Sequence, residues 1–370
     1  MHIGCPKEIK PQEFRVGITP DAAAEAIAHG HSVVIETNAG LGAGFPDEDY
    51  IDVGAQIAPD ASAVFDAAEM IVKVKEPQPV ECAMLRKGQI LFTYLHLAPD
   101  PDQTRALMAS GATCIAYETV TDSRGGLPLL APMSEVAGRL APQVGAWTLQ
   151  KANGGRGVLM GGVPGVAPAR VLVIGGGVVG THAARIAAGM GADVTVLDRS
   201  LPRLRQLDDQ YGGTFKTGYA SKSVTAELAR EADLIIGAVL IPGAAAPKLI
   251  ARDQLKGLKT GAVLVDVAID QGGCFETSRP TTHNAPIYEV DGVMHYCVAN
   301  MPGAVARSST LALGNATMPF MVALADKGWK EACRADPHLL NGLNVHEGQL
   351  TYAAVGEALG IETVPASSVL

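Results

Sequence analysis

The chain has 370 residues, of which 48% are hydrophobic and 5% aromatic, and its formal net charge at pH 7 is −9. This composition is too apolar for a disordered chain, and the length favours about two domains. No run of basic residues is present, and few aromatic side chains are available to stack on bases. Nucleic acid is therefore not expected as a partner.

Membrane and metal partners are not expected either. The first sixteen residues carry charges throughout, without the apolar core of a secretory signal. The longest uncharged stretch, Ser308 to Ala325, contains Ser, Thr, Asn and Pro, and it predicts a buried helix rather than a membrane span. The six cysteines form no C-x-x-C pair, and none has a His at zinc-ligand spacing. We expect free, buried thiols and a cytoplasmic location.

In the first third of the chain, short β-rich runs alternate with helical segments. The runs are HSVVIE (31–36), MIVKVK (70–75), ILFTYLHL (90–97) and TCIAYE (113–118). Thr19-Pro20 and Asp100-Pro101 each predict a helix start, and a Gly follows each helical segment. This alternation predicts βαβ units and a mainly parallel sheet.

A second α/β unit follows in the middle of the chain. A helical pattern from about Ser134 to Ala152 precedes the Gly-rich passage 154–169, which is typical of a domain joint. From Arg170 the alternation restarts, with predicted strands at 171–176, 194–198, 234–239 and 262–268. The chain becomes helical again from Ser309 to about Lys327, and a last helix is expected near 353–358.

The second unit contains the pattern of a dinucleotide site. Gly175-x-Gly177-x-x-Gly180 lies directly between an apolar strand and a helix, where glycines permit a tight turn and close approach of a pyrophosphate. The next strand ends in Asp198, placed to accept from a ribose 2′-hydroxyl. Because this acid would repel a 2′-phosphate, the sequence favours NAD over NADP. The neighbouring Arg199 either softens that preference or simply opens the next helix.

Four polar residues are candidates for the chemistry. His96 ends a strand pattern, and Asp270 lies in the loop after the strand that ends at Asp266. Parallel sheets place ligands beyond the carboxyl ends of their strands, where a His suits proton transfer. Arg15 could hold a carboxylate and Lys75 could polarise a carbonyl. His96 also has a plain structural interpretation as a sheet-edge His, and Arg15 and Lys75 as surface cations.

Taken together, these segments resemble alanine dehydrogenases along essentially the whole chain. The matching segments are IGCPKEIKPQEFRVGITP, KVKEP, YLHLA, MSEVAGRLAPQVGAW, GGRGVLMGGVPGV, GGGVVG, GAVLIPGAAAPKLI, VDVAIDQGGCFETSRPTTH and YCVANMPGAV, in this order. The resemblance implies two Rossmann-like, doubly wound parallel-sheet domains: a substrate and catalytic domain over 1–130 and 307–370, and an inserted NAD domain over 131–306. It also implies a homohexamer.

The resemblance further implies roles for individual residues. Arg15 and Lys75 bind the substrate, and His96 and Asp270 form the catalytic pair. The implied cofactor contacts are Ser134, Val178, Asp198, Arg203, Val239, Leu240, Val267, Ala268, Ile269, Asp270, Arg279, Val298, Ala299, Asn300 and Met301.

The implied reaction converts L-alanine, NAD and water to pyruvate, ammonia and NADH. Either His96 or Asp270 activates the water. Two other activities share this architecture: a lysine or saccharopine dehydrogenase, and the NAD-binding subunit of a proton-pumping transhydrogenase.

Overall fold

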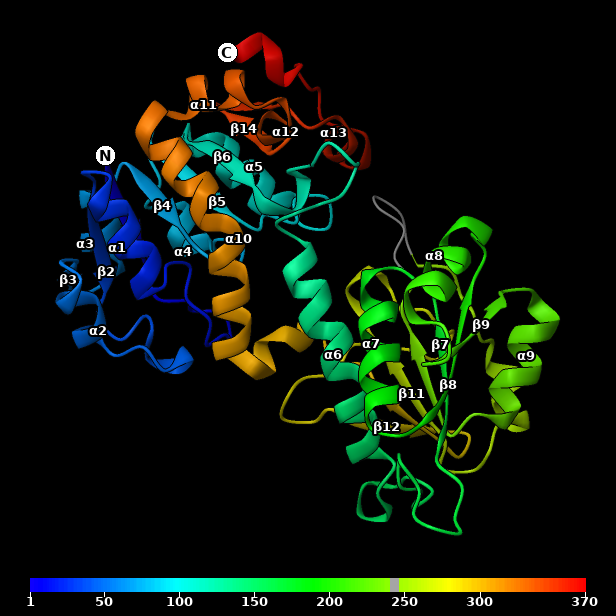
Figure 1. Cartoon of the computed structure of the whole chain (residues 1–370). Helices are drawn as coiled ribbons and strands as arrows, with labels where there is room; N and C mark the ends of the chain where they lie inside the picture. The colour runs from blue at the N-terminus through cyan, green and yellow to red at the C-terminus, as the bar shows by residue number, and fades with distance from the viewer. Residues whose placement is uncertain (240–245) are drawn as a thin grey trace. The chain divides into compact units, whose positions relative to one another are not determined.

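The computed structural model describes residues 1–239 and 246–370, and it divides into two compact units (Figure 1). Unit 1 comprises Met1–Met133 and Val305–Leu370, and unit 2 comprises Ser134–Ala304. The predicted boundaries after residues 130 and 306 lie a few residues from these positions. Each unit is an α/β structure built on its own sheet.

Unit 1 contains an eight-stranded sheet in the order β15-β14-β6-β5-β4-β1-β2-β3. Its strands are β1 His2–Cys5, β2 Ser32–Glu36, β3 Gln56–Ala58, β4 Met70–Val72, β5 Ile90–Thr93, β6 Thr113–Ala116, β14 Leu343–His346 and β15 Gln349–Leu350. The strands β1 to β6 are mutually parallel, whereas β14 pairs antiparallel with β6 and β15. The C-terminal segment thus extends the sheet that the N-terminal segment begins.

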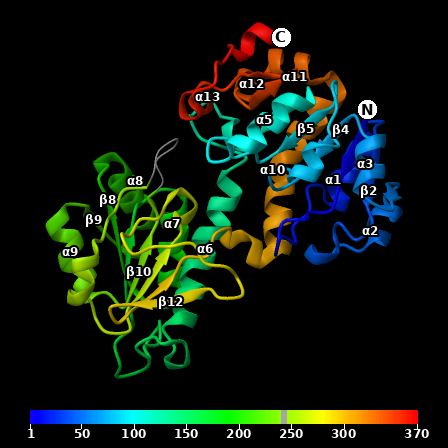
Figure 2. The same cartoon turned by 180° about the vertical axis from the view of Figure 1, so that it is seen from behind.

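Helices cover the sheet of unit 1, and α1 lies beside the long helix α10 (Figure 2). The α-helices of this unit are α1 Pro20–Ala28, α2 Asp47–Asp52, α3 Ala61–Ala67, α4 Pro79–Cys82, α5 Pro101–Ser110, α10 Ala306–Lys327, α11 Trp329–Ala335, α12 Pro337–Leu340 and α13 Ala353–Leu359. The predicted helix starts are confirmed, because Thr19 accepts from the Ala22 amide at 3.1 Å and Asp100 from the Gln103 amide at 3.0 Å.

Unit 2 contains a seven-stranded sheet in the order β12-β13-β11-β10-β7-β8-β9. Its strands are β7 Arg170–Ile174, β8 Asp193–Asp198, β9 Lys216–Tyr219, β10 Leu234–Gly237, β11 Val263–Asp266, β12 Ile287–Val290 and β13 Val293–Tyr296. Every neighbouring pair is parallel except β12 with β13. The chain runs outward from β7 to β9 and then returns to β10 on the other side of β7, which makes β7 and β10 a topological switch point.

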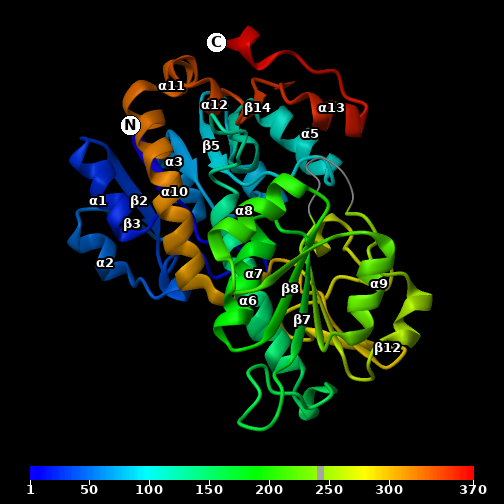
Figure 3. The same ribbon diagram turned by 45° about the vertical axis from the view of Figure 1, so that its right-hand side comes forward.

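The α-helices of unit 2 are α6 Ala131–Thr148, which begins at the end of unit 1, α7 Val178–Gly189, α8 Leu201–Tyr211 and α9 Lys222–Glu231. Reversal of the strand order at β7 places α7 and α9 on opposite sides of the sheet (Figure 3). The helix predicted over 134–152 begins three residues earlier and ends four residues earlier, and a separate 3-10 turn, Lys151–Asn153, follows it. The fold class predicted from the sequence, two Rossmann-like domains, is confirmed by this architecture.

Each unit has its own buried apolar core. In unit 1 the core packs Phe65, Leu91 and Leu107, and in unit 2 it packs Ile235, Leu264 and Phe275. All six cysteines are buried free thiols, as predicted. Within residues 1–239 and 246–370, no helix is both long enough and apolar enough to cross a membrane.

Candidate active site

Three predicted site residues lie in segments that follow the carboxyl ends of neighbouring strands in unit 1. Arg15 follows β1, Lys75 follows β4 and His96 follows β5. Because β1, β4 and β5 are adjacent and parallel, their carboxyl ends meet at one edge. Short, mostly apolar runs form these strands, β4 and β5 being buried throughout, and the polar site residues follow in the loops beyond them.

His96 has a backbone conformation that few residues adopt. Its φ is +49°, in the left-handed region, which costs of the order of 1–3 kcal/mol for a residue other than Gly. The Glu118 carboxylate holds this turn, accepting hydrogen bonds from the amides of Leu95 and, at 2.7 Å, His96. The imidazole is 43% exposed, stacks on Tyr94, and has its Nδ1 4.0 Å from Glu118. The side chain is therefore oriented and accessible.

Arg15 is buried and already engaged by a carboxylate. Its Nε and Nη2 atoms donate to the two oxygens of Glu13 at 2.6 and 2.5 Å, and Nη1 lies 3.1 Å from the sulfur of Met133. Burial alone would lower the pKa of the guanidinium, but the Glu13 contacts raise it above its usual value. The Nε–Nη2 edge of the guanidinium is thus engaged by Glu13, and Nη1 contacts Met133.

Lys75 and Lys10 both contact the carboxylate of Glu76. The Lys75 Nζ is 3.5 Å from Glu76, and Lys10 forms an ion pair with the other oxygen of the same side chain. Burial raises the pKa of the Glu76 carboxyl, but the Lys75 and Lys10 charges outweigh this effect and lower it below its usual value. Two ammonium groups therefore share one carboxylate at this edge of the sheet.

In unit 2 many of the predicted cofactor residues lie at or just after the carboxyl ends of five adjacent parallel strands. Gly175 follows β7, Val239 follows β10 and Asp198 ends β8. The segment 267–270 follows β11, and the segment 298–301 follows β13. The set surrounds the switch point between β7 and β10, where open α/β sheets bind their ligands.

The glycine loop has the geometry that a pyrophosphate needs. Gly175 has φ +105°, and a Cβ on Gly180 would lie 1.7 Å from the Gly175 carbonyl oxygen. A Cβ on Gly177 would point into open space, directly before the N-terminus of α7, which begins at Val178. Backbone amides and the helix dipole thus face a space that any side chain would fill. These residues fit a dinucleotide.

The side chains of Asp198 and Arg203 hydrogen-bond to this loop. The Asp198 carboxylate accepts from the Gly176 amide at 2.7 Å and from the Ser200 amide at 2.8 Å. Arg203 donates from Nε to the Gly176 carbonyl at 2.6 Å and from Nη2 to Thr181 at 2.8 Å. The Arg203 side chain therefore helps to hold the glycine loop in place.

Asp270 is exposed on the 3-10 turn Ile269–Gln271, whereas Ala268 and Ile269 are buried. The fully buried Asp266 organises this loop. It accepts from the Ala268 amide at 3.1 Å, from the Cys274 amide at 2.7 Å and from the Ser278 hydroxyl at 2.5 Å. Burial raises the pKa of the Asp266 carboxyl, although these hydrogen bonds oppose the effect. Asp266 therefore fixes the loop that presents Asp270.

The remaining predicted contacts have varied surroundings. Ser134 lies on the first turn of α6, and Arg279 is exposed, with its guanidinium over the Tyr288 ring at 4.3 Å. Val298 and Met301 are buried, Ala299 and Asn300 are partly buried, and Asn300 has φ +62°. Leu240 lies outside the described residues. Val267 donates its amide to the Gly237 carbonyl at 3.1 Å, next to Val239.

The sequence did not identify three carboxylates that support the site. They are Glu13, Glu118 and Asp266, the last of which was seen only as a strand end and not as the residue that organises its loop. Glu118 ends the strand pattern TCIAYE, at the same edge as His96, and this position could have identified it. Glu13 lies two residues before Arg15 but carries no pattern of its own. Within the described residues, no three His, Cys, Asp or Glu side chains are grouped as metal ligands.

Comparisons with known proteins agree on one family. Family models for the N-terminal and C-terminal domains of alanine dehydrogenase/PNT match residues 4–137 and 141–353. The chain is 63% identical to the alanine dehydrogenase of Halomonas elongata over all of both chains. A solved L-alanine dehydrogenase matches with a TM-score of 0.94 and 50% identity, over 97% of this chain and 99% of that one.

A transhydrogenase structure from Sinorhizobium meliloti matches with a TM-score of 0.81, covering 96% of this chain and all of that one, but at only 25% identity. The shared architecture is therefore broader than the alanine dehydrogenases, while the sequence agrees far better with them. The chain thus belongs to the alanine dehydrogenase family of amino-acid dehydrogenases.

Proposed function

We propose that this protein catalyses the reversible oxidative deamination of L-alanine to pyruvate and ammonia with NAD. The observation that carries the proposal is the 63% identity to an alanine dehydrogenase along the entire chain. The family implies a nicotinamide dinucleotide cofactor, and the glycine loop with Asp198 fits one. Arg15, Lys75, His96 and Asp270 supply the groups that the reaction needs.

A bound nicotinamide would supply the acceptor for the hydride that leaves Cα of the amino acid. Arg15 binds the substrate carboxylate. A deprotonated amine drives the hydride departure and becomes an imine, which water then attacks to release ammonia. His96 or Asp270 takes the proton from that water. Lys75 stabilises the oxygen that develops negative charge at the same carbon.

The assay that tests this proposal follows absorbance at the nicotinamide band. Purified protein should form NADH from L-alanine and NAD at alkaline pH, and consume NADH with pyruvate and ammonium. L-Lysine and saccharopine serve as comparison substrates for the related dehydrogenases. Absence of turnover in both directions with alanine and pyruvate would refute the proposal, and turnover with lysine alone would favour the related activity.

We also propose NAD rather than NADP as the cofactor. The Asp198 carboxylate lies at the end of β8, beside the glycine loop, where it would accept from a ribose hydroxyl and repel a 2′-phosphate. The Arg203 guanidinium donates to the Gly176 carbonyl and to the Thr181 hydroxyl. A transhydrogenase subunit is a weaker alternative to an alanine dehydrogenase. Its structure is 25% identical to this chain, whereas the L-alanine dehydrogenase structure is 50% identical.

Asp198→Ala should raise KM for NAD by roughly ten- to a hundredfold, because a hydrogen bond to a charged group is lost. KM for NADP should rise less or fall. Steady-state kinetics with both cofactors measures the ratio. Asp193→Ala is the matched control, because Asp193 lies at the amino end of the same strand and pairs with Lys216 at the surface. Equal behaviour of the two variants would remove Asp198 from the ribose site.

We further propose a cytoplasmic homohexamer. Leu159, Val163 and Val166 are 52–63% exposed on one loop of unit 2, an apolar set suited to a subunit contact. Light scattering should give about six times the chain mass of 38.3 kDa. A monomer at micromolar concentration would contradict the hexamer.

A further inference from the structure

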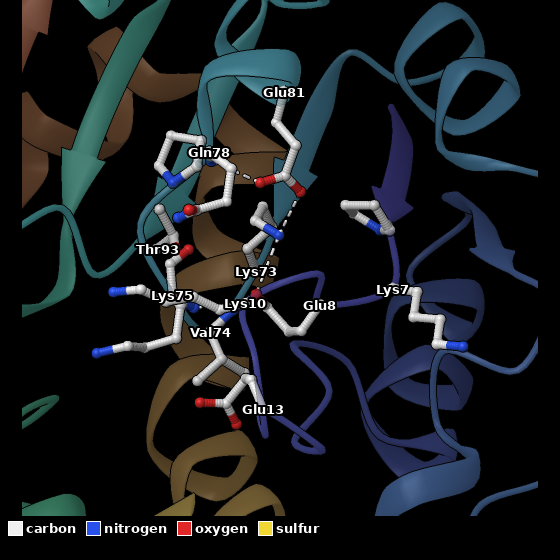
Figure 4. Close-up of polar contacts among 12 residues, drawn as sticks. Lys7, Glu8, Lys10, Glu13, Lys73, Val74, Lys75, Gln78, Glu81 and Thr93 are labelled. Atoms are coloured by element: carbon white, nitrogen blue, oxygen red, sulfur yellow. Dashed lines mark hydrogen bonds and ion pairs between the residues drawn. The ribbon is translucent and has the colours of Figure 1, made fainter. Parts of the chain in front are cut away.

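A buried ion cluster lies behind the candidate site in unit 1 (Figure 4). The Lys73 ammonium is fully buried, 3.1 Å from Glu8 and 2.6 Å from Glu81, and both carboxylates are also buried. Figure 4 shows Lys73 between these two side chains. Since desolvating charges costs several kcal/mol per ion, such a cluster adds little net stability compared with apolar residues. Its role therefore calls for another explanation.

Glu8 also holds the backbone of Lys75. Its Oε2 faces the Lys73 ammonium, whereas its Oε1 accepts from the Val74 amide at 2.7 Å and the Lys75 amide at 3.2 Å. The Thr93 hydroxyl donates to the Lys75 carbonyl at 3.0 Å. The peptide groups on both sides of the Lys75 Cα are thus fixed, one by Glu8 and the other by β5, the strand that leads to His96.

Glu81 anchors the far side of the same loop. One of its oxygens contacts Lys73, and the other accepts from the Gln78 amide at 2.7 Å. The loop 74–78 is therefore tied at both ends to the Lys73 ammonium through carboxylates.

The N-terminal segment packs closely against the end of β4. A Cβ on Gly17, two residues after Arg15, would lie 2.7 Å from the Val72 carbonyl oxygen, so the chain directly after Arg15 approaches the backbone at the end of β4 closely. Glu8 thus connects the N-terminal segment, which carries Arg15, with the backbone of Lys75, the second predicted substrate ligand. Burial raises the pKa of the Glu8 carboxyl, and the Lys73 charge opposes this effect.

We propose that Glu8, oriented by Lys73, is a positioning residue for Lys75 in the substrate site. This inference rests on the function proposed above, in which Lys75 contacts the substrate. Glu8 itself touches no reacting atom. Glu8 fixes the position of the Lys75 backbone, from which the side chain extends. A displacement of about 1 Å is enough to impair a site that depends on the orientation of its groups.

Glutamine cannot replace Glu8 in this arrangement. One carboxylate oxygen faces an ammonium and the other faces two amides, so both positions require acceptors. A carboxamide offers one acceptor and one donor group, and either orientation sets an N–H against another donor. The Lys75 loop should therefore shift in Glu8→Gln while Lys73 keeps its pair with Glu81.

Glu8→Gln should raise KM for pyruvate about tenfold and leave KM for NADH unchanged. Glu36→Gln is the matched control, because Glu36 accepts from the Lys7 amide at 2.7 Å on the same N-terminal segment but does not contact Lys75. A merely structural role would lower the melting temperature without a selective change in KM. Glu8→Asp, which keeps the charge on a shorter arm, should give a smaller rise in KM.

A second measurement is independent of turnover. Lysines are ¹³C-methylated, and the Lys75 resonance is assigned with Lys75→Arg. The resonance should move in Glu8→Gln but not in Glu36→Gln. If wild-type protein shows no turnover while the resonance moves, the proposed function fails and the positioning of Lys75 stands. An unchanged resonance with unchanged KM overturns the inference, as does unfolding of both Glu8 variants, which would show that the cluster serves stability alone.

Discussion

His96→Ala should lower kcat for alanine oxidation by about 10²- to 10⁴-fold, the range typical of a lost general acid or base, with a smaller change in KM. The imidazole is accessible at the carboxyl end of β5, and Glu118 fixes its backbone. Stopped-flow measurement of NADH formation separates this loss from slow product release.

The left-handed backbone at His96 requires a second variant. Alanine tolerates φ +49° poorly, whereas asparagine adopts that region readily. His96→Asn should therefore lose as much activity as His96→Ala but less stability. If His96→Asn keeps a normal kcat, the ring takes no part in proton transfer and Asp270 alone carries that role.

Arg15→Met should both abolish tight substrate binding and destabilise the protein, by about 3–5 kcal/mol, because it leaves Glu13 buried without its main charged partner. Denaturant unfolding measures the stability, and KM for pyruvate reports the binding. From sequence alone, only the KM effect is expected. The structure adds the loss of stability.

The double variant Arg15→Met/Glu13→Gln separates these two effects. It replaces the Glu13 carboxylate with a neutral amide, so it should regain most of the stability and still bind pyruvate poorly. Glu13→Gln alone should keep Arg15 charged and lose the bidentate contact. Recovery of a normal KM in the double variant would show that the guanidinium does not hold the substrate carboxylate.

The sequence predicted the framework of the site because local patterns determine it. The apolar runs before Lys75 and His96 form β4 and β5, and the glycine loop before α7 has the conformation that its spacing predicted. The positions where apolar runs stop therefore identify a sheet edge without any knowledge of distant contacts.

The partners of the site residues depend on contacts between distant segments. Glu8 contacts Lys73 and the Lys75 amide from a separate strand end, and Glu118 contacts the His96 amide from the end of β6. No periodicity or spacing encodes such pairs. The C-terminal addition of β14 to the sheet is similar, because LNVH is too short to predict a strand and its place beside β6 follows only from the assembled sheet.

The pairing of β14 with β6 has a consequence for synthesis of the chain. Until residues 343–346 emerge from the ribosome, β6 ends the nascent sheet and exposes an unpaired row of backbone N–H and C=O groups. Unit 2 is continuous in sequence and emerges while that edge is still open. In that interval unit 2 can be complete while the open edge of β6 in unit 1 can still pair with a strand of a neighbouring chain.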